Sequence, residues 1–404
     1  MRVLHVLSQR PGRTGSGVTL EALVREAAAA GHQQRVLLGS SAEDPAPEVG
    51  DLPPEHVMPL LFGEGSLDFL LPGMSDVMPY ASSCFSCLDV GLLDAYKQAW
   101  KQRLESVLAE FQPDIVHSHH LWLLSSWLKE WLPQGTPVLT HCHATGFRQM
   151  ELCPHLAPAV LRGCARNEAF CVLHAGHAQA LSQRLGVEPK RIHQVGAGYR
   201  KDLFHKRGRS GQATGRMLFV GKLSHAKGLT CLLDAFATMP ESVVRELWVV
   251  GSGGAEESKA LEARMQAMPR VRLLGMLDQA TLAERMRQVD LLVLPSFFEG
   301  LPLVLVEGYA CGCRLVATDL DGIRRELAPR LGEVLHLVAE PAMRGVDVPE
   351  PSALPDFTRR LGQCCEAALL RGPVHQPDEQ VLAAFTWRTV FARVEAIWRR
   401  FSGA

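Results

Sequence analysis

The sequence lacks any apolar run approaching the roughly 18 residues that cross a bilayer. The most apolar early stretch, residues 60–71, is broken by two glycines and two acidic residues. The apolar run at the start of the chain ends at Leu7, which is too short for the core of a signal peptide. We therefore predict a cytoplasmic protein, with peripheral contact at the inner face of the membrane kept as an open alternative.

The sequence also lacks an excess of positive or negative side chains. Its 42 Lys and Arg nearly balance its 43 Asp and Glu, and the net charge is −1. A general nucleic-acid binder needs an excess of basic surface, so we predict no nucleic-acid partner. Eleven cysteines, an odd number, do not suggest a disulfide framework. No GxGxxG motif stands at a first strand–helix turn, which disfavours a nicotinamide site.

The 404 residues, 47% of them hydrophobic, are enough for more than one core. Short apolar runs alternate with Gly-containing loops and helical stretches, which is the rhythm of parallel strands joined by helical crossovers. The rhythm stops at a polar, Gly-rich segment, residues 206–215, and then restarts. The expected strands are 3–7, 36–38, 114–117, 137–140 and 169–173 before this segment, and 217–220, 247–250, 291–295 and 315–318 after it.

This pattern predicts an α/β protein of two Rossmann-like, doubly wound parallel-sheet domains that face a cleft. The domains are residues 1–205 and 216–384, joined by a linker at 206–215. Ligands of such folds sit at the carboxyl ends of the strands. Residues 40–91 fit neither half and are interpreted as an insertion, either a functional, partly mobile cover or a packed embellishment. Its apolar part, residues 60–80, either rests on a membrane surface or forms a packed loop.

One candidate site lies in residues 291–326, where a buried strand ends at Pro295. A loop then carries Glu299, and Glu307 follows eight residues later, inside a helix that starts near Pro302. Amides at the start of that helix suit an anion, while carboxylates accept hydrogen bonds from hydroxyls. The combination is typical of a phosphorylated-sugar site, and the alternative is that one carboxylate is only an exposed helix residue.

A second candidate site lies in residues 219–236, where a strand leads into Gly221 and a helix opens at Gly228. Lys222 and Lys227 are five residues apart on the loop between them. Two ammonium groups on one loop can neutralise a diphosphate without a metal ion. The alternative, solvated lysines, is weakened by the Glu299 segment in the same half of the chain.

Together these motifs resemble those of the GT-B nucleotide-sugar glycosyltransferases of glycosyltransferase family 4, over nearly the whole chain except about residues 40–110. The family signature is a Glu-x7-Glu pair after a Pro-Ser strand end, together with a Gly-Arg/Lys-Leu…Lys-Gly loop. The last residues, 385–404, resemble the family's final helix, which crosses back onto the N-terminal domain. The matching residues are Pro295, Ser296, Glu299 and Glu307; Gly221, Lys222, Leu223, Lys227 and Gly228; Gly251, Ser252 and Gly253; Gly275; Gly312; Gly15, Ser16 and Gly17; and Phe385, Thr386 and Trp387.

The resemblance implies roles for several of the matched residues. Glu307 would bind the donor ribose and Glu299 the sugar hydroxyls, while Lys222 and Lys227 would stabilise the departing diphosphate. Lys222 stands where the family more often has Arg, so a point charge replaces a bidentate group. The remaining residues that the resemblance places at the substrate are Gly300, Leu301, Pro302, Gly221, Gly251, Ser16 and Gly17.

Histidines gather in the first half of the chain, in the segments HSHH (117–120) and HCH (141–143). A metal site with Cys84 and Cys87 as further ligands is disfavoured, because structural zinc needs paired ligand spacings and no second CxxC follows. The resemblance instead makes His143 an active-site residue. Arg148 is a weaker candidate for a phosphate or acidic acceptor, with surface packing as the alternative.

A DxD sequence, residues 319–321, follows a strand, but its place in the family pattern favours a loop over a metal site. We therefore predict a retaining, metal-independent glycosyltransferase without a cofactor. It would move a hexose or N-acetylhexosamine from a UDP or GDP sugar to an unidentified acceptor: a glycan, a glycolipid or a small molecule. The alternatives are a nucleotide-sugar epimerase on the same fold and an inactive GT-B subunit that binds a partner.

Overall fold

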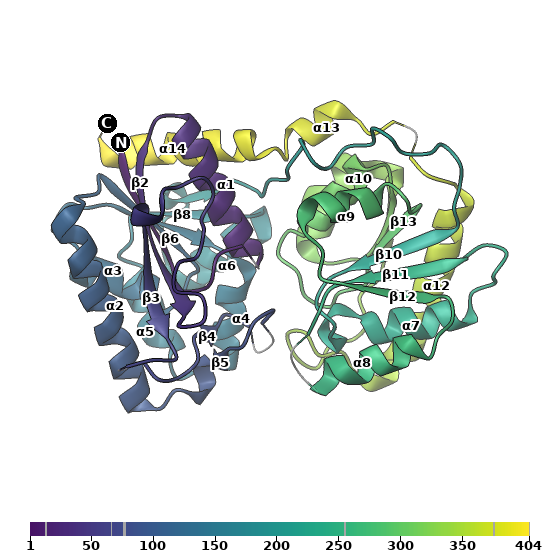
Figure 1. The fold of residues 1–404 in the computed structure, drawn as a ribbon, viewed down its shortest axis with the longest axis horizontal. Helices are drawn as coiled ribbons and strands as arrows, with labels where there is room; N and C mark the ends of the chain where they lie inside the picture. The colour runs from purple at the N-terminus through teal and green to yellow at the C-terminus, as the bar shows by residue number, and fades with distance from the viewer. Residues whose placement is uncertain (13, 66, 76–77, 254–255, 375, 404) are drawn as a thin grey trace. The chain divides into compact units, whose positions relative to one another are not determined.

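A computed structural model describes residues 1–12, 14–65, 67–75, 78–253, 256–374 and 376–403 (Figure 1). The chain forms two compact units. Unit 1 comprises Met1–Ala197 and Trp387–Ala404, and unit 2 comprises Gly198–Thr386. The final helix therefore belongs to the same unit as the first strand.

The boundary between the units lies earlier than the predicted linker, because residues 206–215 are part of unit 2. The buried Arg209 guanidinium donates hydrogen bonds to the carbonyls of Met286 and Val289, at 3.1 and 2.6 Å, and pairs with Asp290. The Asp290 carboxylate also accepts hydrogen bonds from the amides of Thr214 and Gly215. These contacts anchor a segment whose polar composition alone predicts a free linker.

In the described part of unit 1 the main sheet has seven parallel strands in the order β3-β2-β1-β6-β7-β8-β9. Helices cover both faces of the sheet (Figure 1). The strands are β1 (Arg2–Leu7), β2 (Gln33–Ser41), β3 (Val57–Phe62), β6 (Ile115–His119), β7 (Val138–Cys142), β8 (Ala169–Val172) and β9 (Ile192–Gln194). The helices are α1 (Gly15–Ala29), α2 (Val90–Glu110), α3 (Leu123–Trp131), α4 (Ala144–Leu152), α5 (Ala157–Cys164), α6 (Ala175–Leu185) and α14 (Trp387–Ser402), with short 3₁₀ turns at Pro54–His56, Phe85–Cys87 and Pro189–Arg191.

Helix α14 packs on unit 1 because its apolar residues recur at helical spacing. Phe391, Val394, Ile397 and Trp398 are buried and join one core cluster with residues of α1 and of strands β1, β6, β7 and β8. The opposite face of the sheet is covered mainly by α2, α3 and α5, which bury a second cluster. Strand residues alternate between the two clusters, as the period of two requires.

The insertion at residues 40–91 is packed into unit 1. Its strand β3 pairs in parallel with β2 at the edge of the main sheet, and the two-residue strands β4 (Pro72–Gly73) and β5 (Ser83–Cys84) pair with each other. Phe62, Leu71 and Phe85 are almost completely buried in the core. The packed alternative is therefore the one that the described residues support, although Leu70 is 48% exposed.

The described part of unit 2 holds six parallel strands in the order β12-β11-β10-β13-β14-β15. The strand order reverses at β10 and β13, where the loops that follow the strands diverge to opposite sides. The strands are β10 (Arg216–Val220), β11 (Glu246–Val250), β12 (Val271–Gly275), β13 (Leu291–Leu294), β14 (Arg314–Thr318) and β15 (Leu335–Val338). The helices are α7 (Leu229–Thr238), α8 (Glu256–Gln266), α9 (Gln279–Met286), α10 (Leu303–Ala310), α11 (Ala328–Leu331), α12 (Leu354–Leu370) and α13 (Glu379–Ala383), with 3₁₀ turns at His225–Lys227, Gly332–Val334 and Pro351–Ala353 and a π-helical turn at Ile323–Leu327.

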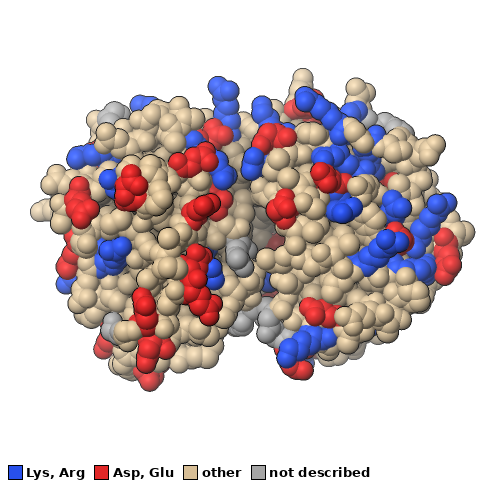
Figure 2. Space-filling view, viewed as in Figure 1, with Lys and Arg blue, Asp and Glu red and all other residues tan. Residues whose placement is uncertain are grey.

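The surface carries both signs of charge. Basic and acidic side chains are interspersed on the face drawn in Figure 2. Among the described residues, none of the helices combines the length and the apolar character needed to cross a membrane.

Candidate active site

The ion pair between Lys227 and Glu299 is the centre of the candidate site in unit 2. The Lys227 ammonium lies 2.6 Å from Glu299 Oε1, and the two side chains are 24% and 16% exposed. Lys227 ends the turn after β10, and Glu299 lies on the loop after β13. These strands are neighbours, so two residues 72 positions apart in the sequence meet at one sheet edge.

Glycine makes this meeting possible at two positions. Gly228 has a φ of +67°, and a Cβ there would lie 2.0 Å from the carbonyl oxygen of Pro295. Gly251, after β11, has a φ of +145°, and a Cβ there would lie 1.8 Å from the carbonyl oxygen of Gly221. Only glycine fits such backbone-to-backbone approaches. The loops after β10, β11 and β13 are thus packed against one another, which places their polar groups.

Glu307 lies on α10, the helix that follows the Glu299 loop, and is 9% exposed. Burial raises the pKa of its carboxyl from 4.5 to about 7, since desolvation disfavours the charged form. Pro302 is the N-cap of α10, so Gly300 and Leu301 lead directly into the helix. The first amides of the helix have no intrahelical acceptor, and this end suits an anion.

Lys222 lies on the loop between β10 and the Lys227 turn and is half-buried. Its backbone carbonyl accepts a hydrogen bond from the Ser224 amide at 3.0 Å, and the neighbouring Leu223 amide donates to the Ser252 carbonyl at 3.2 Å. The loop is therefore held by its own backbone. Lys222, Lys227, Glu299 and Glu307 all belong to unit 2, as the sequence predicts from their spacing.

His143 lies in unit 1, where it is the N-cap residue of α4 at the end of β7. Its ring is 8% exposed, and its Nε2 lies 3.3 Å from Nδ1 of His119. The His120 ring lies close by, with 4.8 Å between the ring centroids. Burial, followed by the neighbouring imidazoles, holds the pKa of His143 well below its ordinary value. The ring is therefore neutral at pH 7, suited to hydrogen bonding with an uncharged group.

Ser16 and Gly17 lie in the first turn of α1, and both are buried. The Thr14 hydroxyl accepts a hydrogen bond from the Gly17 amide at 3.2 Å and lies 3.0 Å from the Ser16 hydroxyl. A Cβ at Gly17 would lie 2.6 Å from the backbone nitrogen of Gly12, so glycine is required here for packing. Arg148 lies on α4, five residues after His143.

Two metal-binding alternatives considered from the sequence have other partners in the structure. Asp319 accepts a hydrogen bond from Arg324 at 2.8 Å, and Asp321 accepts one from Arg325 at 2.6 Å. Both DxD carboxylates are thus engaged by arginines. Cys84 and Cys87 form a disulfide with each other, so their thiols are not free as ligands, and the expectation of no disulfide framework misses this local pair.

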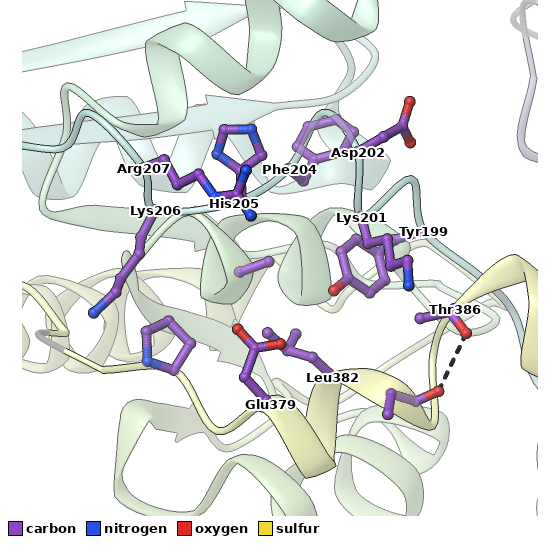
Figure 3. Close-up of a pocket in the computed structure, with 13 residues that line it drawn as sticks. Tyr199, Lys201, Asp202, Phe204, His205, Lys206, Arg207, Glu379, Leu382 and Thr386 are labelled. Carbon is purple, nitrogen blue, oxygen red and sulfur yellow. Dashed lines mark hydrogen bonds between the residues drawn. The ribbon is translucent and has the colours of Figure 1, made fainter.

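A cavity of about 570 Å³ lies elsewhere in unit 2. Tyr199, Lys201 and Lys206 line it from the start of the unit, and Glu379 lines it from α13 (Figure 3). Its described lining includes none of the four candidate Lys and Glu side chains. The cavity is therefore a feature separate from the candidate site.

Sequence reasoning gives no role to three residues that the structure brings to the strand ends. The buried hydroxyls of Ser296 and Thr318, at the carboxyl ends of β13 and β14, have no hydrogen-bond partner among the described residues. His120 has a φ of +71°, the sole positive value for a non-glycine in the described chain. Such backbone positions cluster at functional sites. The HSHH run is the one sequence signal that points to His120.

Two family models match the chain. Residues 14–198 match the model described as "Glycosyl transferase 4-like domain", and residues 214–342 match "Glycosyl transferases group 1". Together these matches span well over half of the sequence. The chain belongs to glycosyltransferase family 4. The resemblance seen in the sequence motifs is thereby confirmed.

Relatives of this family member include the phosphatidyl-myo-inositol mannosyltransferase of Mycobacterium tuberculosis, which is 33% identical over 196 residues, or 46% of this chain and 48% of that protein. The chain thus spans about half the length of the curated mycobacterial relatives that it matches. The D-inositol 3-phosphate glycosyltransferase 1 of Catenulispora acidiphila is 27% identical over 339 residues, or 74% of this chain and 77% of that protein.

Solved structures show the fold. Sucrose-phosphate synthase from Thermosynechococcus elongatus superposes with a TM-score of 0.71 at 18% identity. WaaG, a glycosyltransferase involved in lipopolysaccharide biosynthesis, superposes with a TM-score of 0.63 at 17% identity. Both matches cover 100% of each chain. The predicted GT-B fold class, with two parallel-sheet α/β units, is confirmed.

Proposed function

We propose that this family 4 member is a retaining glycosyltransferase that moves a hexose or N-acetylhexosamine from a UDP or GDP sugar to an inositol-containing acceptor. The observation that carries the proposal is the 2.6 Å Lys227–Glu299 pair on loops that Gly228 and Gly251 hold together. A cation and a hydrogen-bond acceptor at one sheet edge match the two ends of a sugar diphosphate.

In the transfer, the bond between the anomeric carbon and the diphosphate oxygen breaks, and a bond from the acceptor oxygen to the same carbon forms on the same face. The acceptor proton passes to the leaving diphosphate, so no protein general base is needed. Lys227 and Lys222 stabilise the charge that develops on the diphosphate. Glu299 accepts hydrogen bonds from the sugar hydroxyls, and Glu307 accepts them from the ribose.

Two lysines suffice for this diphosphate, so the proposal includes metal independence. The Asp319 and Asp321 carboxylates are engaged by Arg324 and Arg325, which supports this assignment. The names of the matched relatives, an inositol phosphate glycosyltransferase and a phosphatidyl-inositol mannosyltransferase, support the acceptor class. A lipid-linked acceptor would bring the protein to the cytoplasmic face of a membrane.

The first test is a thermal-shift screen of the protein against UDP, GDP, ADP and dTDP and their common sugars, with and without magnesium. A ligand that binds only the native state raises the midpoint. We expect a shift with one nucleotide class that does not depend on magnesium. A shift that requires magnesium would overturn metal independence, and no shift with any of them would favour an inactive, partner-binding subunit.

The second test is product analysis with the donor found, using inositol phosphate in solution and phosphatidylinositol vesicles as acceptors. Transfer with the anomeric configuration of the donor preserved is expected. An inverted product would overturn the retaining mechanism, and a changed nucleotide sugar without transfer would identify an epimerase. Full transfer by Glu299→Ala and Lys227→Ala variants would overturn the site assignment.

A further inference from the structure

Unit 1 contains a cluster of buried histidines on the sheet face that α1 and α14 cover. His5 on β1, His117 and His119 on β6, and His141 on β7 alternate with residues of the opposite face, and Cys171 on β8 continues the row. The strand register aligns His5 with His117, His119 with His141 and His141 with Cys171. Five side chains with metal-ligand chemistry thus share one face of four adjacent strands.

The rings of the cluster are close together and shielded from solvent. His117 stacks on His119 with 5.0 Å between the ring centroids and on His141 with 5.6 Å. Each of the five side chains is at most 2% exposed. Trp398 of α14 closes the cluster, with its ring centroid 5.6 Å from that of His117.

The ring nitrogens of this cluster lack the hydrogen bonds that buried polar atoms usually make. Both nitrogens of His117 and of His141, Nδ1 of His5 and Nε2 of His119 are buried without a hydrogen-bond partner among the described residues. Leaving a buried polar group without a hydrogen bond is destabilising, because the group has lost its hydration. Several ring nitrogens without a partner in the described chain lie on one face of this sheet, so a ligand that binds to their lone pairs would stabilise the protein.

The hydrogen bonds around His5 leave the lone pair of its Nδ1 free to bind a ligand. The Gln34 amide nitrogen donates to the Val24 carbonyl at 3.0 Å, so the amide oxygen of Gln34 faces His5 Nε2, also at 3.0 Å. His5 Nε2 must therefore carry the hydrogen, and Nδ1 is the bare nitrogen. A ligand histidine that donates its other N–H to an oxygen is the usual arrangement around protein-bound metals.

Two groups of donor atoms lie within 4.8 Å of one another: one from each of His5, His117 and His119, and one from each of His117, His141 and Cys171. Zinc holds nitrogen and sulfur ligands at about 2.0–2.3 Å in a tetrahedron, so its ligand atoms lie about 3.4–3.7 Å apart. Side-chain rotations that move each donor by about one ångström would close either group around an ion.

The geometry points to a buried site in unit 1 for a thiophilic divalent metal of the zinc type, held by His117, His141 and Cys171 with His5 or His119 as the fourth ligand. The thiolate favours this group, because it removes one of the two positive charges that the core must otherwise accommodate. Neutral imidazole is the form that binds a metal.

The proposed ligands lie inside the core of unit 1, whereas Lys227 and Glu299 lie in unit 2. His143 of the candidate site contacts two of the proposed ligands, since its Nε2 lies 3.3 Å from His119 Nδ1 and its ring stacks on that of His141. Spacing along the chain does not predict this metal site. Four strands supply the ligands one or two at a time, so no paired-cysteine motif is needed. Binding of the metal would stabilise unit 1, and loading must accompany folding because the core is closed.

The test is to express the full chain in medium containing zinc, to dialyse it against metal-free buffer, and to measure metal content. We expect about one equivalent of zinc per chain and a lower Tm after unfolding and refolding with a chelator. Refolding with Co²⁺ should give the visible absorption of a tetrahedral ion together with a thiolate-to-cobalt charge-transfer band. Protein that holds no metal after either treatment overturns the proposal.

Two matched variants assign the ligands. Cys171→Ala should abolish the charge-transfer band, whereas Cys142→Ala should keep it, because Cys142 is a buried thiol on the opposite face of the sheet. His117→Leu should abolish metal retention, with the exposed His155→Ala as its control. If His117→Leu does not fold, the Cys171→Ala spectrum decides. A charge-transfer band that survives in Cys171→Ala, or disappears in Cys142→Ala, contradicts the assignment.

Discussion

The two units place polar side chains at the ends of their parallel strands in opposite ways. Unit 2 uses charged residues on loops, the half-buried Lys227 and Glu299, where solvent still moderates the cost of the charges. Unit 1 uses imidazoles at the strand ends, such as His119 at the end of β6 and His143 directly after β7, where burial keeps them neutral. The difference agrees with the proposal that unit 2 binds the charged diphosphate of the donor, whereas unit 1 offers uncharged imidazole groups.

The largest expected effect on activity comes from removing the charges of unit 2. Glu299→Gln and Lys227→Ala should each lower kcat/KM by about 10²–10³, the loss typical of one group that stabilises developing charge. Steady-state kinetics with the identified donor measures this. Lys259→Ala is the control, because Lys259 is an exposed lysine of the same unit that pairs with the exposed Glu256. Equal losses in the variants and the control would contradict the special role of the pair.

The next effect concerns the backbone that brings the charged loops together. Gly228→Ala puts a Cβ at 2.0 Å from the Pro295 carbonyl oxygen at a positive φ. It should destabilise unit 2 by about 3 kcal/mol, a fall in Tm of roughly 6–12 °C. Calorimetry measures the Tm of Gly228→Ala and of a control variant, Gly211→Ala. A Cβ at Gly211 would meet open space, so the Tm of the control should stay close to that of the unmodified protein. Similar Tm values for the two variants would show that the close approach is not needed.

A smaller effect distinguishes the buried carboxylate from its exposed neighbours. The pKa of Glu307 is raised from 4.5 to about 7, so its protonated form is favoured in the folded protein. The stability that this provides is present below pH 4.5 and is lost as the pH rises through about 7. Ribose hydroxyls need the ionised acceptor, so nucleotide affinity should increase about tenfold from pH 6 to pH 8. Calorimetric titration measures the nucleotide affinity at each pH. The affinity of the Glu307→Gln variant should not change with pH. If this variant keeps the pH dependence of the unmodified protein, Glu307 does not bind the ribose.

An effect of about the same size as that of Glu307 is expected in unit 1, where a neutral imidazole provides one hydrogen bond. His143→Ala should lower kcat/KM about tenfold, which corresponds to roughly 1.4 kcal/mol. The rate should not depend on pH between 6 and 8 through this residue, because its pKa lies well below that range. Steady-state kinetics measures kcat/KM of His143→Ala, and the exposed His155→Ala serves as the control variant. A loss as large as that of Glu299→Gln would show that the two units do not differ as described.

Much of the fold and of the unit 2 site follows from local sequence patterns. The expected strands at 291–295 and 315–318 are β13 and β14, and the helix expected to start near Pro302 is α10, within about one residue. The boundary between the units does not follow. The segment 206–215 has the composition of a linker, and only the buried Arg209 shows that it is anchored. Long-range contacts of one side chain cannot be read from composition.

The sequence by itself determined the family and the two-unit α/β fold, because loop glycines and charged residues occur at the spacings of the family motifs. The same motifs single out Lys222, Lys227, Glu299 and Glu307 as candidate site residues, whose roles stay predictions. Tertiary structure alone decided which of these groups meet. It paired Lys227 with Glu299 across 72 residues, and it aligned His5, His117, His141 and Cys171 on one face of the sheet. The physical reason is that parallel strands become neighbours through crossovers of variable length, so the register between strands, and not the spacing along the chain, sets the distance between their side chains.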